Sequence, residues 1–179
     1  MLTTNNAVLL LIDVQGKLAR SMADSPALIE KLRALIQGVQ HLDLPILWVE
    51  QYPQGLGPTV PELSELLGAQ APLTKLSFGC GGEPTILAAL SALKRRQVLV
   101  CGIETHVCVY QSVVQLLSEG YQVEVVSDAV GSRQGADKAM ALAKMARLGA
   151  ELTSVEMCLF ELMGRCDHPQ FKRLLPLVK

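Results

Sequence analysis

Short apolar runs alternate with longer helical patterns along this 179-residue chain, and this alternation limits its possible folds more than any other feature. The runs at residues 7–12, 45–49, 98–101 and 122–126 are rich in valine, isoleucine and leucine and have the length of strands. Apolar runs of this kind indicate parallel strands that are covered on both faces. Shorter runs at 71–75 and 150–153 are predicted to be edge strands.

Helical patterns occupy the segments between these runs. Leu28, Leu32, Leu35 and Val39 fall on one face of a predicted helix that ends near His41. Further helices are predicted near residues 84–93, 106–119, 135–148 and 155–164. Because crossovers between parallel strands are right-handed, the economical fold is a Rossmann-like α/β sandwich of three layers, with six parallel strands and helices on both faces. At roughly 150 residues per domain, the length predicts a single domain over residues 1–179.

Charge and cysteine usage exclude several classes of partner. Sixteen Lys and Arg against seventeen Asp and Glu give a formal net charge of -1, which argues against a nucleic acid or an anionic membrane as partner. Residues 1–6 carry no basic side chain and the next apolar run is too short for a signal sequence, so we expect a cytoplasmic protein. The five cysteines contain no Cys-x-x-Cys pair and are expected to be free thiols. The remaining partners are a small molecule and further copies of the chain, as a homo-oligomer.

Chemically active side chains follow several of the predicted strands. In open parallel sheets, ligands bind at the carboxyl ends of the strands, near the point where the strand order reverses. Asp13 follows the first strand, Gln51 the second and Lys75 the third, whereas Cys108 lies just beyond the fourth. Cys108 falls in the first turn of a predicted helix, where unpaired N–H groups favour a thiolate and can also stabilise an oxyanion. The pattern predicts a nucleophilic cysteine at this edge.

A free thiol is mostly protonated at neutral pH, so Cys108 needs help from a neighbour. Asp13 comes directly after a buried strand, where a carboxyl group is partly desolvated, and its pKa is expected to be raised toward that of a general base. Lys75 would balance its charge and favour the thiolate. Taken singly, each residue has an ordinary interpretation, since such a carboxylate often only caps a turn and such a lysine is usually solvated.

Other polar and aromatic residues near this edge are candidates for binding a substrate. Gln15 and Gln51 could orient a polar group, although either could only cap a turn. Tyr52 and Phe78 could form an apolar wall, although aromatic residues near strand ends often belong to the core. His106 could form a hydrogen bond in the site or point into solvent.

Three segments resemble the signatures of the isochorismatase-like cysteine hydrolases. They are LLIDVQ at residues 10–15, LTKLSF at 73–78 and GIETHVCV at 102–109, and their order and spacing also match. Two more segments, EQYPQGLGPT at 50–59 and CDHP at 166–169, are most similar to the isochorismatase-domain-containing subgroup.

This resemblance implies a sheet in the order 3-2-1-4-5-6 and a catalytic triad of Asp13, Lys75 and Cys108. It also implies a cis peptide bond between Ile103 and Glu104, and an oxyanion hole formed by the N–H groups of Glu104 and Cys108. In the implied reaction, Asp13 takes the thiol proton and Cys108 attacks an amide carbonyl. Asp13 then returns the proton to the departing amine, and water hydrolyses the thioester.

The sequence also departs from part of the family. Nicotinamidases of this family bind a metal through an Asp-x-His pair and another histidine after the second strand, whereas here no histidine lies between that strand and His106. We therefore expect no metal site and no cofactor. Members that act on isochorismate lack the nucleophilic cysteine, so Cys108 argues against that reaction.

The resulting hypothesis is a metal-independent cysteine hydrolase that cleaves a non-peptide C–N bond of a small amide, or a related carbonyl compound, through a thioester on Cys108. One alternative is a catalytically idle, oligomeric scaffold or small-molecule-binding protein with the same fold. Another is redox use of Cys108, with Cys80 or Cys101 as the resolving thiol.

Overall fold

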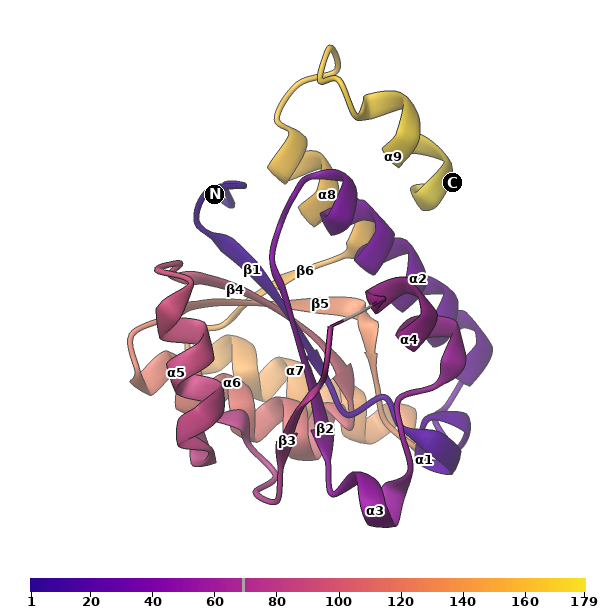
Figure 1. Cartoon of the computed structure of the whole chain (residues 1–179), viewed down its shortest axis with the longest axis vertical. Coiled ribbons are helices and arrows are strands. Elements are labelled where there is room, and N and C mark those ends of the chain that lie inside the picture. Colours follow the sequence, from indigo (N-terminus) through magenta and orange to yellow (C-terminus); the bar gives the residue numbers. More distant parts are fainter. Residues whose placement is uncertain (69) are drawn as a thin grey trace.

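The computed structural model describes residues 1–68 and 70–179. Within these residues, six parallel strands form one sheet in the order β3-β2-β1-β4-β5-β6 (Figure 1). The strands are β1 (Ala7–Ile12), β2 (Ile46–Gln51), β3 (Leu73–Lys75), β4 (Gln97–Ile103), β5 (Gln122–Gly131) and β6 (Glu151–Thr153). The predicted α/β class, the strand order and the two edge strands are therefore confirmed.

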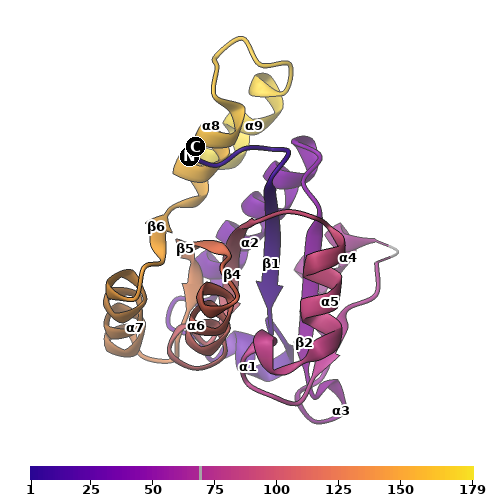
Figure 2. The ribbon, with the colours of Figure 1, turned by 90° about the vertical axis from the view of Figure 1, so that its left-hand side faces the viewer.

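Helices cover both faces of this sheet (Figures 1 and 2). One face is covered by α5 (Pro84–Ala92), α6 (Tyr110–Ser118) and α7 (Gly135–Arg147). The other is covered by α1 (Gly16–Arg20), α2 (Ser25–His41), α4 (Pro61–Leu67), α8 (Val155–Met163) and α9 (Phe171–Val178). The remaining elements are the short turns α3 (Pro53–Leu56), η1 (Cys80–Gly82) and η2 (Thr105–Val109).

The central strand β1 supplies side chains to two separate hydrophobic cores. Leu9 and Leu11 point toward the core beneath α2 and α8, whereas Val8, Leu10 and Ile12 point toward the core beneath α5 and α6. Every residue of β1 is buried. Burial of each large aliphatic side chain contributes about 1.5–3 kcal/mol, which explains why both alternating positions of this strand are apolar.

Several element boundaries differ from the predicted ones. Strand β2 continues to Gln51 and pairs there with Lys75, because backbone pairing extends beyond the apolar run. The predicted helix at 106–119 is divided into the wide turn η2 and the regular helix α6. The sequence pattern did not indicate α9, which contains Pro176 and packs against α2 and α8.

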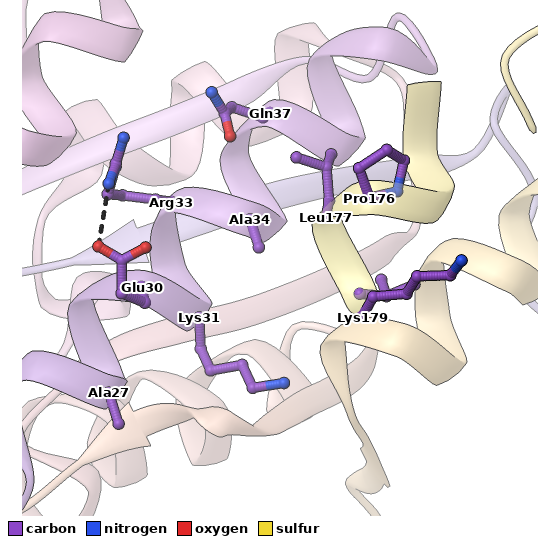
Figure 3. A pocket seen from close by; sticks show the side chains of 10 residues that line it. Ala27, Glu30, Lys31, Arg33, Ala34, Gln37, Pro176, Leu177 and Lys179 are labelled. Atoms are coloured by element: carbon purple, nitrogen blue, oxygen red, sulfur yellow. Dashed lines mark hydrogen bonds and ion pairs between the residues drawn. The ribbon is translucent and has the colours of Figure 1, made fainter. Parts of the chain in front are cut away.

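A groove of about 370 Å³ lies between α2 and the end of α9 (Figure 3). Its lining includes Glu30 and Arg33, whose side chains form an ion pair at 2.9 Å, and Leu177 on α9. Neither Asp13, Lys75 nor Cys108 lines it. Among the described helices, none has both the length and the apolar character needed to cross a membrane.

Gly102 allows β4 to pack directly against the end of β1. Its φ is +116°, and a Cβ atom built on it would lie 2.0 Å from the carbonyl oxygen of Ile12. Both the backbone conformation and the available space therefore require glycine at this position.

We predict that Gly102→Ala lowers the free energy of unfolding by at least about 2 kcal/mol, because the backbone of either β1 or β4 must move. Gly135→Ala is the control, since a Cβ atom there meets nothing within 4 Å and is expected to cost nothing. Chemical denaturation of both variants measures the difference. Equal stability of the two variants would contradict the requirement for glycine.

Candidate active site

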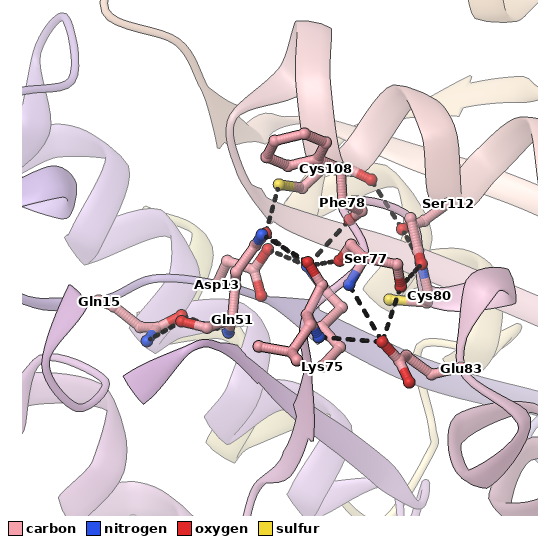
Figure 4. Close-up of polar contacts among 12 residues, drawn as sticks. Asp13, Gln15, Gln51, Lys75, Ser77, Phe78, Cys80, Glu83, Cys108 and Ser112 are labelled. Carbon is pink, nitrogen blue, oxygen red and sulfur yellow. Dashed lines mark hydrogen bonds and ion pairs between the residues drawn. The ribbon is translucent and has the colours of Figure 1, made fainter. Parts of the chain in front are cut away.

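The carboxyl ends of β1 and β3, which lie on either side of β2, bring Asp13 and Lys75 into direct contact (Figure 4). Asp13 directly follows β1 and has a φ of +55°, and Lys75 is the last residue of the edge strand β3. The Lys75 Nζ atom lies 2.6 Å from Asp13 Oδ2, and the two side chains are 0% and 2% exposed. Residues 62 positions apart in sequence thus form a buried ion pair.

The Lys75 ammonium group is surrounded by oxygen atoms. Besides Asp13, it donates to Gln51 Oε1 at 3.0 Å and to the carbonyl oxygens of Ser77 at 3.2 Å and Phe78 at 2.9 Å. Removing a cation from water is costly unless such groups compensate it. These contacts fix the ammonium group at the end of β3, and with it the position of Asp13.

Asp13 has the properties expected of a general base. Burial raises the pKa of its carboxyl group above the ordinary value, and the charge and hydrogen bond of Lys75 oppose this shift. Lys75 occupies the Oδ2 atom, whereas Oδ1 has no hydrogen-bond partner within the described part of the chain. Oδ1 is therefore the atom available to accept a proton.

Cys108 lies in η2, after β4, and its side chain reaches the same cluster. Its Sγ atom donates a hydrogen bond to Gln51 Oε1 at 3.3 Å. Burial raises the pKa of the Cys108 thiol to about 12, and the negative charge of Asp13 acts in the same direction. This direction is opposite to the one expected from the charge of Lys75, which lowers the pKa by less than burial raises it. A protonated thiol needs a base to remove its proton.

The turn that carries Cys108 has an irregular backbone. The Ile103–Glu104 peptide bond is cis. The Glu104 carbonyl oxygen accepts hydrogen bonds from the N–H groups of Val107 and Val109, in the wide pattern of a π-type turn. The Glu104 carboxylate lies 3.1 Å from Arg133 Nε. Glu104 and Cys108 thus share one turn, and the oxyanion hole formed by their N–H groups stays a prediction.

Gln15 was predicted to contact a substrate, but the structure gives it a different role. The side chain is fully buried, and its Oε1 atom accepts a hydrogen bond from the Gln51 N–H at 2.7 Å. Its Nε2 atom donates to the carbonyl oxygens of Gln51 at 3.0 Å and Gly57 at 2.7 Å. Both ends of the amide are occupied, so Gln15 holds the end of β2 in place.

The other predicted substrate contacts are not all gathered at the triad. His106 Nδ1 lies 3.0 Å from Ser132 Oγ, and its Nε2 lies 3.9 Å from Asp137, so the ring faces β5 and α7. Tyr52 and Phe78 are about half exposed, on the loops that follow β2 and β3. Tyr52 also lines a hollow of about 460 Å³, together with Lys75 at the end of β3, Leu76 and nearby residues.

Two residues that the sequence analysis did not select support this site. Ser112 Oγ accepts the Cys80 N–H at 2.9 Å and donates to the Cys108 carbonyl oxygen at 2.7 Å. Glu83 Oε1 accepts the N–H groups of Leu76 and Ser77, which shapes the loop that contributes carbonyl oxygens to Lys75. The position of Ser112 four residues after Cys108 was the available signal, because such residues are neighbours on a helix.

Within residues 1–68 and 70–179, no cluster of three or more His, Cys, Asp or Glu side chains is arranged to hold a metal ion. The chemistry that the site offers comes from a protonated thiol, a buried carboxylate and a buried ammonium group.

Comparison with known proteins identifies relatives over nearly the whole chain. The isochorismatase domain family matches residues 7–157. Isochorismatase domain-containing protein 2 of Macaca fascicularis is 40% identical over 177 residues, which cover 97% of this chain and 83% of that protein.

Solved structures with the same fold include proteins with different descriptions. The MAR1 ribonuclease of Caenorhabditis elegans is 38% identical, with a TM-score of 0.92 over 99% of this chain and 91% of that one. YcaC of Pseudomonas aeruginosa, solved with hexane-2,5-diol and covalent acrylamide, is 28% identical, with a TM-score of 0.91 over 98% and 90% of the two chains.

We predict that Lys75→Met lowers the free energy of unfolding by about 3–5 kcal/mol at pH 8, because it leaves the Asp13 carboxylate buried without a partner. The pKa of Asp13 then rises further, so the folded variant keeps a proton that the unfolded chain releases, and its stability falls as pH increases. The loss relative to the wild type should be smaller at pH 5. Denaturant titrations at both pH values measure it.

Arg20→Met is the control for this experiment, since it removes an exposed ion pair with Glu62 and should cost less than about 1 kcal/mol at either pH. A Lys75→Met variant with a loss that is independent of pH would contradict the assignment of a buried, ionised Asp13.

Proposed function

The chain belongs to the isochorismatase family, and we propose that it is a metal-independent cysteine hydrolase. The proposed reaction cleaves a non-peptide C–N bond of a small amide, or a related carbonyl compound, through a thioester on Cys108. The observation that carries this proposal is the buried contact of 2.6 Å between Lys75 and Asp13, in a cluster that Cys108 joins through Gln51. The proposed enzyme is one domain over residues 1–179.

In the proposed mechanism, the proton of Cys108 Sγ moves to Asp13 Oδ1, the carboxylate oxygen that has no other partner among the described residues. The sulfur attacks the amide carbonyl carbon, and a carbon–sulfur bond forms. Asp13 then gives the proton to the leaving nitrogen as the C–N bond breaks, so ammonia or an amine departs. Water attacks the thioester carbon and gives a proton to Asp13, the C–S bond breaks, and Asp13 returns that proton to the sulfur as the acid leaves.

The other residues have separate roles in this proposal. Lys75 keeps the Asp13 carboxylate ionised and oriented, since its charge opposes the effect of burial on the Asp13 pKa. The N–H groups of Glu104 and Cys108 stabilise the oxyanion. Gln51, Tyr52 and Phe78 remain candidates for substrate contact, because Gln51 reaches the triad and both aromatic side chains are exposed beside it.

The Pseudomonas aeruginosa relative supports a nucleophile in this fold, because its structure holds covalent acrylamide. Acrylamide is an electrophile and also a primary amide, so it combines the reactivity of a thiol probe with the proposed substrate class. The name of the Caenorhabditis elegans relative suggests ribonuclease activity instead. The net charge of -1 in this chain favours a small molecule over RNA as substrate.

Location and assembly form part of the same proposal. All five cysteines are free thiols, which fits the reducing cytoplasm.

Leu76 is 75% exposed, and Tyr52 and Phe78 are exposed nearby on the loops after β2 and β3, so we propose that this surface is covered in a homo-oligomer. Light scattering after size exclusion measures the mass, and a monomer at micromolar concentration would overturn this part.

We predict that wild-type protein incubated with a panel of small primary amides carries an acyl adduct, detected by intact mass spectrometry after a rapid acid quench. Cys108→Ala should carry none and release no ammonia. Asp13→Asn should keep the fold and lose turnover by at least about 100-fold, since a general base contributes roughly 10²–10⁴-fold.

Other outcomes support the alternatives. If no amide forms an adduct or releases ammonia, the substrate class is wrong and an idle binding protein is the better interpretation. Degradation of RNA that depends on Cys108 would favour a ribonuclease. A disulfide between Cys108 and Cys80 or Cys101 after peroxide treatment, without hydrolysis of any amide, would favour redox use of the thiol.

We also predict that dialysis against EDTA leaves the rate of ammonia release unchanged, because the proposed mechanism uses only side chains of the chain. The control is a sample to which zinc is added back after dialysis. A loss of activity that zinc restores would refute the metal-independent mechanism.

A further inference from the structure

The geometry around Gln51 fixes the direction of two hydrogen bonds. Its Oε1 atom lies 3.0 Å from Lys75 Nζ, and an ammonium group can donate hydrogen bonds but cannot accept them. The atom that faces Lys75 must therefore be the amide oxygen. The Nε2 atom on the other side donates to the Leu76 carbonyl oxygen at 3.2 Å, which agrees with this orientation.

The same oxygen lies 3.3 Å from Cys108 Sγ. Because an amide oxygen carries no proton, the thiol must be the donor in this contact. The proton of the nucleophile is thus held by Gln51, while Asp13 Oδ1 lacks a partner within the described residues. Cys108 nevertheless lies close enough to Asp13 to affect its pKa. Gln51 and Asp13 are therefore two acceptors competing for one proton.

Gln51 is held firmly enough to act on the thiol. Its backbone N–H and carbonyl oxygen both bond to the buried side chain of Gln15, at 2.7 and 3.0 Å. Its backbone also pairs with Lys75 in the sheet. The amide oxygen therefore has a fixed position beside the sulfur.

We propose that Gln51 is a positioning residue that guards the Cys108 thiol, because its amide oxygen holds the thiol proton away from Asp13 until the catalytic transfer from Sγ to Oδ1. This inference rests on the proposed function, in which that transfer begins the reaction. An amide oxygen that faces the sulfur stabilises the protonated thiol and repels a thiolate.

The charged groups around the sulfur come from two other elements. Asp13, after β1, opposes the thiolate, and Lys75, on β3, favours it. Cys80, on η1, is a further titratable group nearby and is itself protonated, since burial raises its pKa to about 11. Replacing Gln51 also removes one acceptor of Lys75, but the ammonium group keeps Asp13 and the carbonyl oxygens of Ser77 and Phe78, so the charged groups that face the sulfur stay the same in kind and number.

The test is the rate at which iodoacetamide alkylates Cys108 between pH 6 and 10, followed by peptide mass spectrometry. Gln51→Met keeps the length of the side chain but removes the acceptor. We expect alkylation at pH 8 to become about five- to tenfold faster, because the loss of one hydrogen bond from the thiol increases the thiolate fraction. The exposed Cys166 provides an internal reference in every sample.

Two further variants complete the experiment. Gln54→Met changes an exposed glutamine three residues away and should alkylate at the wild-type rate. Gln51→Glu keeps an acceptor and adds negative charge beside the sulfur, so its alkylation should be slower than in the wild type.

A folded Gln51→Met variant that is alkylated at the wild-type rate at every pH between 6 and 10 would overturn the guarding role. If Gln51→Met does not fold, Gln51→Glu decides, because alkylation at or above the wild-type rate then overturns the proposal. The assay requires no turnover, so a shift in the Gln51→Met profile without any amide hydrolysis would reject the proposed function and leave the guarding role in place.

Discussion

The buried ion pair between Asp13 and Lys75 is the interaction on which the site depends. It joins the central strand β1 to the edge strand β3, and it brings two charges to positions that water does not reach. The carbonyl oxygens of Ser77 and Phe78 compensate the ammonium group, so the loop after β3 must adopt one conformation. Fold and chemistry are therefore linked, because the chain cannot lose this loop conformation without leaving a buried charge unpaired.

Much of the fold could be predicted because its strands are buried on both faces. Val8, Leu9 and Leu10 are apolar without alternation, and the structure divides them between two cores. The short runs that contain Lys75 and Thr153 correctly indicated the edges of the sheet. Helix α9 was not predicted, because Pro176 interrupts its pattern and its stability comes from packing against α2 and α8.

The sequence indicated which residues gather at the site better than it indicated their protonation states. The placement of Asp13 and Lys75 at the carboxyl ends of parallel strands, on the same edge of the sheet, follows from sheet topology, which the sequence pattern indicates. The protonation of Cys108 does not follow from its position in the sequence, since it reflects burial in the folded chain and the negative charge of Asp13. The role of Gln15 also could not be predicted from the sequence. Only the folded chain shows that its amide donates hydrogen bonds to the backbone carbonyl oxygens of Gln51 and Gly57.

The hydrogen bonds of Gln15 constrain which parts of such a protein can change over evolutionary time. This single side chain fastens the loop at both ends, at Gln51 and at Gly57, so residues 52–56 lie between two fixed points. Because both ends are held, we expect side-chain substitutions between them to leave Asp13, Lys75 and Cys108 in place. Under the proposed function, selectivity can diversify in this short segment while the triad is inherited intact, which separates the choice of molecule from the chemistry performed on it.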